Sequence, residues 1–276
     1  MDFDFEQIPV PFRMQPGLQR LAPDQAGLTH LQTGSALAAE KRAVVLAGQA
    51  LHQVPGFDAG PALAALARHS GTAPAPADPS PGGAAALALR WEEDLAVLDG
   101  SSGTLPWMCV CVPSHWAPED KLGLSFAALH APVADNAALM AASDSLVRLV
   151  TDGNAWRRHV WTLTPDSRYD QHPRRITRRP WPDTLDDADF ASRCFLRVER
   201  QTFIPVSDGD NAGLRQAVFS IRVMIQPLHE AVSSAARARR LHDALASMST
   251  AVLDYKNLRP AREPLLRWLS QRAREA

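Results

Sequence analysis

Two segments, near residues 200 and 220, alternate in character with a period of two and constrain the fold more than any other feature of the chain. In the first segment, Arg197, Glu199 and Gln201 share one face of an extended strand. Arg200 belongs to the opposite face. In the second segment the alternation gives one apolar face, made of Ala217, Phe219, Ile221, Val223 and Ile225. Arg222 points away from that face, so the two segments predict long neighbouring strands with polar groups on both sides.

The rest of the chain predicts further strands and a set of helices. The expected strands are 94–98 and 107–112, which form a hairpin, and 161–164. The expected helices are 35–52, 118–130, 136–150 and a C-terminal helix with its apolar face on Leu241, Leu245, Met248, Val252 and Tyr255. The predicted fold class is therefore α+β, an antiparallel sheet of about five strands with flanking helices.

The chain length and composition allow one large domain. With 276 residues and 46% hydrophobic content, residues 1–276 can bury a single substantial core. We expect this domain to consist of four parts: an N-terminal arm and helix at 1–70, a Pro/Gly/Ala-rich loop at 71–84, a core at 85–228, and C-terminal helices at 229–276.

Charge and cysteine content restrict the partners and the compartment. The formal net charge of −1 gives no global electrostatic case for binding nucleic acid or an anionic membrane. No run of eighteen apolar residues predicts a membrane span. The three cysteines, Cys109, Cys111 and Cys194, form no paired framework, and no signal peptide opens the chain. We therefore expect a cytoplasmic protein.

The segment PSHWAPEDKLGLSFAALHAPV, residues 113–133, contains the leading candidate for a metal ligand. Pro118 suits a first helical turn, and Pro132 disfavours helix at the residue before it, so the helix is expected to stop beside His130. An imidazole there can bind a metal or simply interact with the helix dipole. Three other histidines remain alternative ligands, namely His115, His159 and His172.

This segment resembles the most recognisable motif of the haem-dependent oxidative N-demethylase alpha-subunit family, long known only as a domain of unknown function. Phe195-Leu-Arg-Val-Glu-Arg-Gln-Thr202 is similar to the family's Arg-x-Glu-Arg-Gln-Thr strand, and Phe219-Ser-Ile-Arg222 with Pro227-Leu228 to the segment after it. The resemblance implies a PAS-like core that binds haem. It also implies oxidative removal of an N-methyl group from a small, dimethylamine-like secondary amine, with O2 consumed and formaldehyde released.

The resemblance further implies a set of site residues. His130 would be the axial ligand of the iron, in a non-covalent haem b because the chain has no Cys-x-x-Cys-His motif. Phe126 and Val133 would line the haem slot. The propionates would pair with guanidinium groups, for which the candidates are Arg197, Arg200 and Arg222. The alternative for these arginines is a set of surface ion pairs.

Glu199 is the candidate catalytic residue. A carboxylate near a haem can hold an alkylammonium ion by a charge-assisted hydrogen bond or accept its proton. The alternative is a salt bridge to Arg197 or Arg200. The chain differs from the family at one position near this site. The family usually has an Arg-x-Asn-Trp strand, and the corresponding segment here is Arg158-His-Val-Trp161, so Val160 replaces the asparagine.

Electrons would have to come from other proteins. The chain has no Gly-rich dinucleotide motif and no cysteine quartet, so flavin mononucleotide and an iron–sulfur cluster are expected only on partner reductase subunits. A basic cluster, Arg174, Arg175, Arg178 and Arg179, is either a solvated face or a docking patch for an acidic partner.

Two other functions stay open: a haem-binding sensor or carrier without catalysis, and a haem-free module that binds another small molecule.

Overall fold

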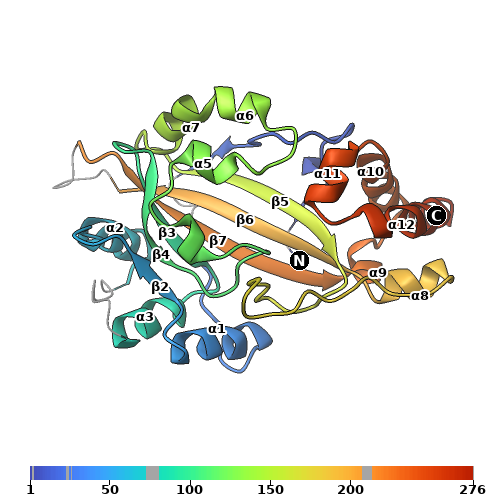
Figure 1. The fold of residues 1–276 in the computed structure, drawn as a ribbon, viewed down its shortest axis with the longest axis horizontal. Coiled ribbons are helices and arrows are strands. Elements are labelled where there is room, and N and C mark those ends of the chain that lie inside the picture. Colours follow the sequence, from blue (N-terminus) through green and yellow to red (C-terminus); the bar gives the residue numbers. More distant parts are fainter. Residues whose placement is uncertain (2, 23–24, 26, 73–80, 207–212, 276) are drawn as a thin grey trace.

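A computed structural model gives the protein one seven-stranded antiparallel sheet (Figure 1). The strand order is β1-β5-β6-β7-β3-β4-β2. The structure describes residues 1, 3–22, 25, 27–72, 81–206 and 213–275. The α+β fold class is confirmed, with more strands than the expected five.

The two long strands expected near residues 200 and 220 are confirmed, whereas the strand expected at 161–164 begins earlier, at Trp156, and the one expected at 107–112 spans Thr104–Cys109. The strands are β1 (Gln19–Arg20), β2 (Leu51–Gln53), β3 (Asp94–Asp99), β4 (Thr104–Cys109), β5 (Trp156–Thr164), β6 (Phe195–Pro205) and β7 (Gln216–Pro227). The hairpin β3–β4 and the pair β6–β7 are confirmed. β1 and β2 have two and three residues, too few to show a period in the sequence.

The register between β5, β6 and β7 defines two faces of the sheet. Glu199 lies directly opposite Val160 on β5 and Val223 on β7, so these three side chains share one face. We call it the Glu199 face. Arg200 lies opposite His159 and Arg222, which therefore point to the other side. The predicted assignment of residues to the two faces of β6 and β7 is confirmed.

Helices from both ends of the chain cover the side of the sheet opposite the Glu199 face. α1 (Ala36–Leu46), α2 (Gly60–Ser70) and α3 (Pro81–Ala88) pack with β3 and β4, at the lower left of Figure 1. α10 (Ala235–Ala246) and α12 (Arg262–Arg272) pack with β5 and β6. α8 (Asp187–Ser192) and α9 (Leu228–Ala231) lie beside them.

Several expected helices are shorter than predicted. The first helix ends at Leu46, because the chain turns there and forms β2. The C-terminal helix is interrupted after Ala246, and α11 (Thr250–Tyr255) begins anew with Ser249 as its N-cap. Tyr255 is about half exposed rather than part of a continuous apolar face. The expected loop at 71–84 is wrong at its end, where α3 begins; residues 73–80 lie outside the described residues.

The Glu199 face is partly covered by four short helices. α4 (Pro118–Lys121) and α5 (Phe126–His130) replace the single helix expected at 118–130, and α6 (Ala137–Ala141) and α7 (Ser143–Val150) replace the one expected at 136–150. Gly123 has a φ of 73°, which a helix does not allow, and separates α4 from α5. Phe203 and Phe219 stack at 4.7 Å between ring centroids and pack with Val150. No helix among the described residues is long and apolar enough to cross a membrane.

Candidate functional site

A chain of hydrogen bonds crosses the Glu199 face, and the Glu199 carboxylate is at its centre. Ser114 Oγ donates to Glu199 Oε1, and Gln201 Nε2 donates to Oε2 at 2.7 Å. At one end Arg197 Nε donates to Ser114 Oγ at 2.8 Å, and at the other Arg158 Nε donates to Gln201 Oε1 at 2.7 Å. Two guanidinium groups therefore hold the carboxylate through neutral side chains.

The carboxylate has no direct ion pair with either of the arginines considered from the sequence. Arg197 and Arg200 make their polar contacts with other groups. A neutral hydroxyl or amide donor fixes a carboxylate in place without cancelling its charge. Each oxygen of Glu199 therefore accepts a hydrogen bond from a neutral side chain, while its negative charge acts on the nearby Arg158, Arg197 and Lys256.

Arg197 is almost completely buried, with 1% of its surface exposed. Besides Ser114, its guanidinium donates to the backbone carbonyls of Val112, Arg168 and Tyr169 at 2.9 to 3.2 Å. Burial lowers its pKa to about 10, and the charge of Glu199 opposes that shift. These contacts use its donors inside the protein and tie β6 to the segments around residues 112 and 168.

Arg200 and Arg222 lie on the other side of the sheet. Arg200 donates to Glu93 at 3.0 Å and Arg222 donates to Glu92 at 2.7 Å. The three arginines predicted to hold the haem propionates therefore do not lie together. Only Arg197 is on the same face as Glu199.

His130 is the last residue of α5, and its ring is fixed in one orientation. Its Nδ1 lies 2.7 Å from the carbonyl of Phe126, one turn earlier. This contact makes Nδ1 the protonated nitrogen and leaves the Nε2 lone pair free, with no hydrogen-bond partner among the residues that the structure describes. Burial lowers the pKa of His130, and the positive charge of Arg158 lowers it further, so the ring is neutral at pH 7.

The neighbours of His130 hold both its ring and its backbone. The Phe126 ring lies 4.1 Å from the imidazole, between centroids. The His130 carbonyl accepts from Val133 N and from Asn136 Nδ2, each at 3.0 Å. Phe126 and Val133, predicted to line a haem slot, thus both contact His130.

The other candidate histidines are placed differently. His172 is buried and uses both ring nitrogens, with Nε2 3.1 Å from Glu119 and Nδ1 accepting from the backbone N–H of Arg174 at 3.1 Å. His159 lies opposite the Glu199 face, 5.6 Å from the ring of Phe3. His115 adopts a φ of 60°, and burial lowers its pKa to about 4.

Two residues from the end of α11 complete the surroundings of Glu199. The Lys256 ammonium donates to the Trp161 carbonyl at 2.8 Å. Burial lowers its pKa to about 8, and the negative charge of Glu199 opposes this. Burial, with Glu199 acting in the same direction, raises the pKa of Tyr255. The predicted site did not include Ser114, Arg158 or Lys256, although Ser114 lies inside the 113–133 motif and Arg158 begins the Arg158-His-Val-Trp161 match.

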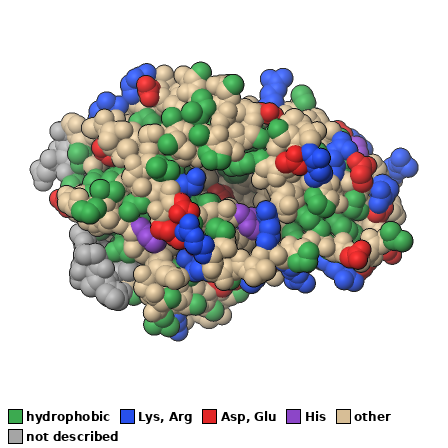
Figure 2. Space-filling model, viewed as in Figure 1, with side chains coloured by type: hydrophobic (Ala, Val, Ile, Leu, Met, Phe, Trp, Pro, Cys, Tyr) green, Lys and Arg blue, Asp and Glu red, His purple; other side chains and the backbone are tan. Residues whose placement is uncertain are grey.

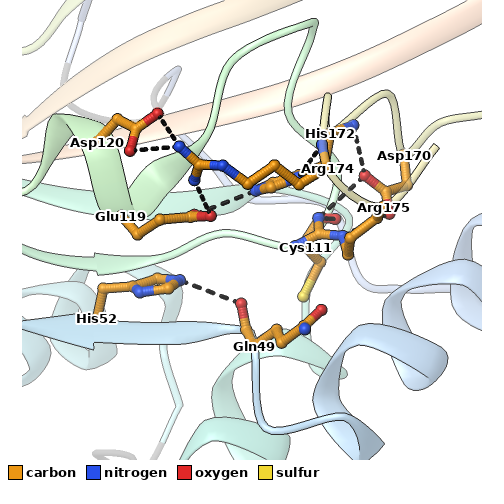
Figure 3. Close-up of polar contacts among 9 residues, drawn as sticks. All are labelled: Gln49, His52, Cys111, Glu119, Asp120, Asp170, His172, Arg174 and Arg175. Carbon is orange, nitrogen blue, oxygen red and sulfur yellow. Dashed lines mark hydrogen bonds and ion pairs between the residues drawn. The ribbon is translucent and has the colours of Figure 1, made fainter. Parts of the chain in front are cut away.

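The basic cluster divides into two parts in the structure. Arg174 pairs with Glu119 and Asp120 of α4, and Arg175 pairs with Asp170 and donates to the Cys111 carbonyl (Figure 3). These contacts attach the segment around residue 172 to α4. The remaining two arginines, Arg178 and Arg179, are exposed. The side chains of Cys109 and Cys111 are buried free thiols, as expected for core residues.

The surface above this arrangement is hollowed. In Figure 2, viewed as in Figure 1, a depression lies near the centre of the molecule, between the part formed by α5 and the part formed by α11. It lies over the β5–β7 part of the sheet.

Fold and site together define an α+β protein with an imidazole, His130, whose Nε2 is free, and a carboxylate, Glu199, held by neutral donors. The model of a known family, described as haem-dependent oxidative N-demethylase, alpha subunit-like, matches residues 75–266. That range is more than half of the chain and includes β3 to β7, α5 and α11. The chain belongs to this family, and the resemblance noted in the sequence is confirmed.

Proposed function

We propose that this protein is the haem-binding component of an oxidative N-demethylase that acts on a small secondary amine. The overall reaction is R–NH–CH3 + O2 + 2 e− + 2 H+ → R–NH2 + HCHO + H2O. The observation that carries the proposal is His130, a neutral imidazole with one nitrogen tied to a backbone carbonyl and the other free, in a chain of this family.

The residues present fit a haem in its axial position. Proximal histidines of haem proteins are held by a hydrogen bond from the nitrogen that does not bind the iron, and the contact between His130 and Phe126 supplies that bond. Phe126 and Val133 add apolar surface beside the ring. His172 and His159 fit less well, because one has both nitrogens engaged and the other is on the opposite face.

The bound haem would supply the oxidation chemistry with O2. The residues of the chain would bind and orient the amine. Glu199 would accept a hydrogen bond from the ammonium and offset the hydration that the ion loses on entering the depression. Ser114 and Gln201 would keep the carboxylate in position, and Val160, directly opposite Glu199, would face the alkyl groups of the amine.

The remaining elements of the proposal concern the assembly and its setting. The family description as an alpha subunit supports a complex with other subunits, which would carry flavin mononucleotide and an iron–sulfur cluster and deliver electrons to haem b. We further propose a cytoplasmic location, a PAS-like core and one domain over residues 1–276. The continuous antiparallel sheet, formed by strands from both sides of residues 71–84, supports the last of these.

Val160 favours a second candidate, a haem protein without catalysis. The family's usual amide is absent at a position directly opposite Glu199, so a polar contact beside the carboxylate is lost. A haem sensor or carrier would bind haem through His130 and show no turnover. Turnover of a secondary amine in the presence of a chemical or protein reductant distinguishes the two.

The ligand assignment is tested by the visible spectrum of the haem-reconstituted protein. We expect His130→Ala to lose the haem or to change the Soret band, because it removes the proposed axial nitrogen. His172→Ala and His159→Ala are the matched controls and should keep the wild-type spectrum. A His130→Ala protein with unchanged haem content and spectrum would show that another group binds the iron, and wild-type protein with no Soret band would remove the proposal altogether.

A further inference from the structure

A small pocket lies beside the proposed amine site, where β5 ends. It is formed by the end of β5, the chain that follows it, and the residues after α11. Its lining consists of His115, Thr162, Leu163, Thr164, Pro165, Asp166, Arg178, Arg179, Trp181, Lys256 and Asn257. Neither the predicted site residues nor the family description accounts for this pocket.

The pocket carries an excess of positive charge. Asp166 is its one acidic lining residue, and Arg168 already binds that carboxylate through two nitrogens at 2.6 and 3.1 Å. Arg178 and Arg179 make no hydrogen bond or ion pair with the described part of the chain. Lys256 donates to the Trp161 carbonyl, and its ammonium lies 5.7 and 5.8 Å from the ring centroids of Phe12 and Trp161. Lys256, Arg178 and Arg179 therefore line a space whose one acidic lining residue, Asp166, is already paired with Arg168.

The pocket is also close to Glu199. Thr162, in its lining, is two residues along β5 from Val160, the cross-strand neighbour of Glu199. Residues two apart on a strand share a face and are separated by roughly 7 Å. The charge of Glu199 acts on Lys256, which confirms the proximity from the other side. A small anionic group in this pocket would thus lie next to whatever binds at Glu199.

We propose that this pocket binds a carboxylate group. Lys256 and Arg178 provide charge that matches the acceptor oxygens of a carboxylate. The Thr162 hydroxyl, whose hydrogen bond to the Leu163 carbonyl is long at 3.4 Å, can rotate to add a neutral donor. Two sources offer this chemistry beside Glu199: a haem propionate, and a carboxylate on the amine substrate itself, as in an N-methyl amino acid. The choice between the sources rests on the proposed function, whereas the pocket's affinity for a carboxylate does not.

The first experiment uses the haem-free protein and propionate as the probe. Binding is followed by NMR line broadening of 13C-labelled propionate, with wild type, Lys256→Met, Arg178→Gln and the matched control Arg239→Gln. Arg239 is exposed on α10 and does not belong to the lining of the pocket. We expect at least fivefold weaker binding in Lys256→Met and Arg178→Gln, and no change in the control. Equal propionate binding by all four proteins would overturn the proposal, and Arg178→Gln keeps the test valid if Lys256→Met is poorly folded.

The second experiment distinguishes the sources. If the carboxylate is a haem propionate, Lys256→Met should lower haem retention at least fivefold and leave the ratio of N-methylglycine to dimethylamine affinity unchanged. If it belongs to the substrate, haem retention should stay constant while N-methylglycine binding falls at least tenfold relative to dimethylamine. A variant with wild-type haem retention and wild-type preference between the amines would contradict both. Failure of the proposed function itself would show separately, as a wild-type protein without a Soret band.

Discussion

At the scale of single residues, Ser114 and Gln201 hold the Glu199 carboxylate between the guanidinium groups of Arg197 and Arg158 without a direct hydrogen bond from either arginine. The two-residue period placed Glu199 correctly with Arg197 and Gln201. The period could not show that Ser114, far away along the chain, would stand between the arginine and the carboxylate. An arginine and a glutamate on one strand face look like an ion pair in the sequence, but here a hydroxyl separates them and leaves the carboxylate its charge.

The charge on Glu199 is therefore expected to matter for binding amines. Glu199→Gln keeps the size of the side chain and removes the charge, so amine binding or turnover should fall by at least about tenfold, which is about 1.4 kcal/mol. The measurement is an amine titration of the haem spectrum at equal haem content. Glu92→Gln makes the same chemical change at the Arg222 pair on the other side of the sheet and should leave amine affinity unchanged. Equal affinities in wild type and Glu199→Gln would reduce Glu199 to a structural role.

At the scale of elements, the long strands were predictable and the short helices were not. β6 and β7 have 11 and 12 residues, enough for a period to show both their existence and their faces. The segment 118–130 has apolar residues at helical spacing, but Gly123 adopts a left-handed conformation and Ser125 starts a new helix by capping Ala128 N at 3.2 Å. The backbone preferences of Gly123 and Ser125 thus divided the segment into two helices, although its apolar spacing predicted one continuous helix.

His130 was nevertheless correctly placed as the last residue of a helix, although the expected cause is wrong: Ala131, which precedes Pro132, keeps helical angles with φ −54° and ψ −37°. The positions of α4 and α5 relative to the sheet depend on contacts that are distant in the sequence. The principal one joins Glu119 of α4 to His172 and Arg174, across more than fifty residues (Figure 3). Such contacts give no signal in a single sequence.

This contact should make the stability of the protein depend on pH. Although burial opposes the shift, hydrogen bonds from its own backbone N–H, His172 and Arg174 lower the pKa of Glu119 to about 2, against 4.5 for the free side chain. A carboxyl group with a lowered pKa stabilises the fold above its unfolded pKa and loses that contribution as the pH falls from 4.5 toward 2. Glu119→Gln should therefore be less stable than wild type at pH 7, and the difference should shrink at pH 3.

Urea unfolding at the two pH values measures this difference. The exposed Glu230 pairs only weakly with His229, at 4.0 Å, and Glu230→Gln is the matched control that should show little effect at either pH. A Glu119→Gln deficit that is the same at pH 3 and pH 7 would exclude the charge of Glu119 as the cause.

At the scale of the whole molecule, one sheet joins parts of the chain that the sequence separates by a Pro/Gly/Ala-rich segment. β2 lies before that segment and pairs with β4 after it. A buried ion pair makes a second connection, because Lys41 of α1 lies 3.1 Å from Asp94 at the start of β3 and donates to the Trp91 and Glu93 carbonyls. The lysine was visible in the sequence only as one of several charges on a helix, and only the fold reveals that it is fully buried.

The Lys41–Asp94 pair tests whether the N-terminal helices and the sheet unfold as one unit. Lys41 is 0% exposed, and Asp94 also accepts from the backbone N–H of Val112 at 2.7 Å. Lys41→Met leaves the Asp94 charge buried without its cation, so the free energy of unfolding should fall by about 3–5 kcal/mol. Arg42→Met, at the exposed neighbouring position on α1, should change it by no more than about 0.5 kcal/mol.

Urea unfolding followed by tryptophan fluorescence and by far-ultraviolet circular dichroism makes the measurement. If residues 1–276 form one domain, the two probes should give coincident single transitions in wild type and should shift together in Lys41→Met, because loss of α1 packing exposes the sheet that shares its core. The C-terminal helices α10 and α12 pack on the same side of that sheet and should unfold with it. Two separated transitions, with only one of them moved by Lys41→Met, would mean that α1 to α3 and the C-terminal helices belong to independent units.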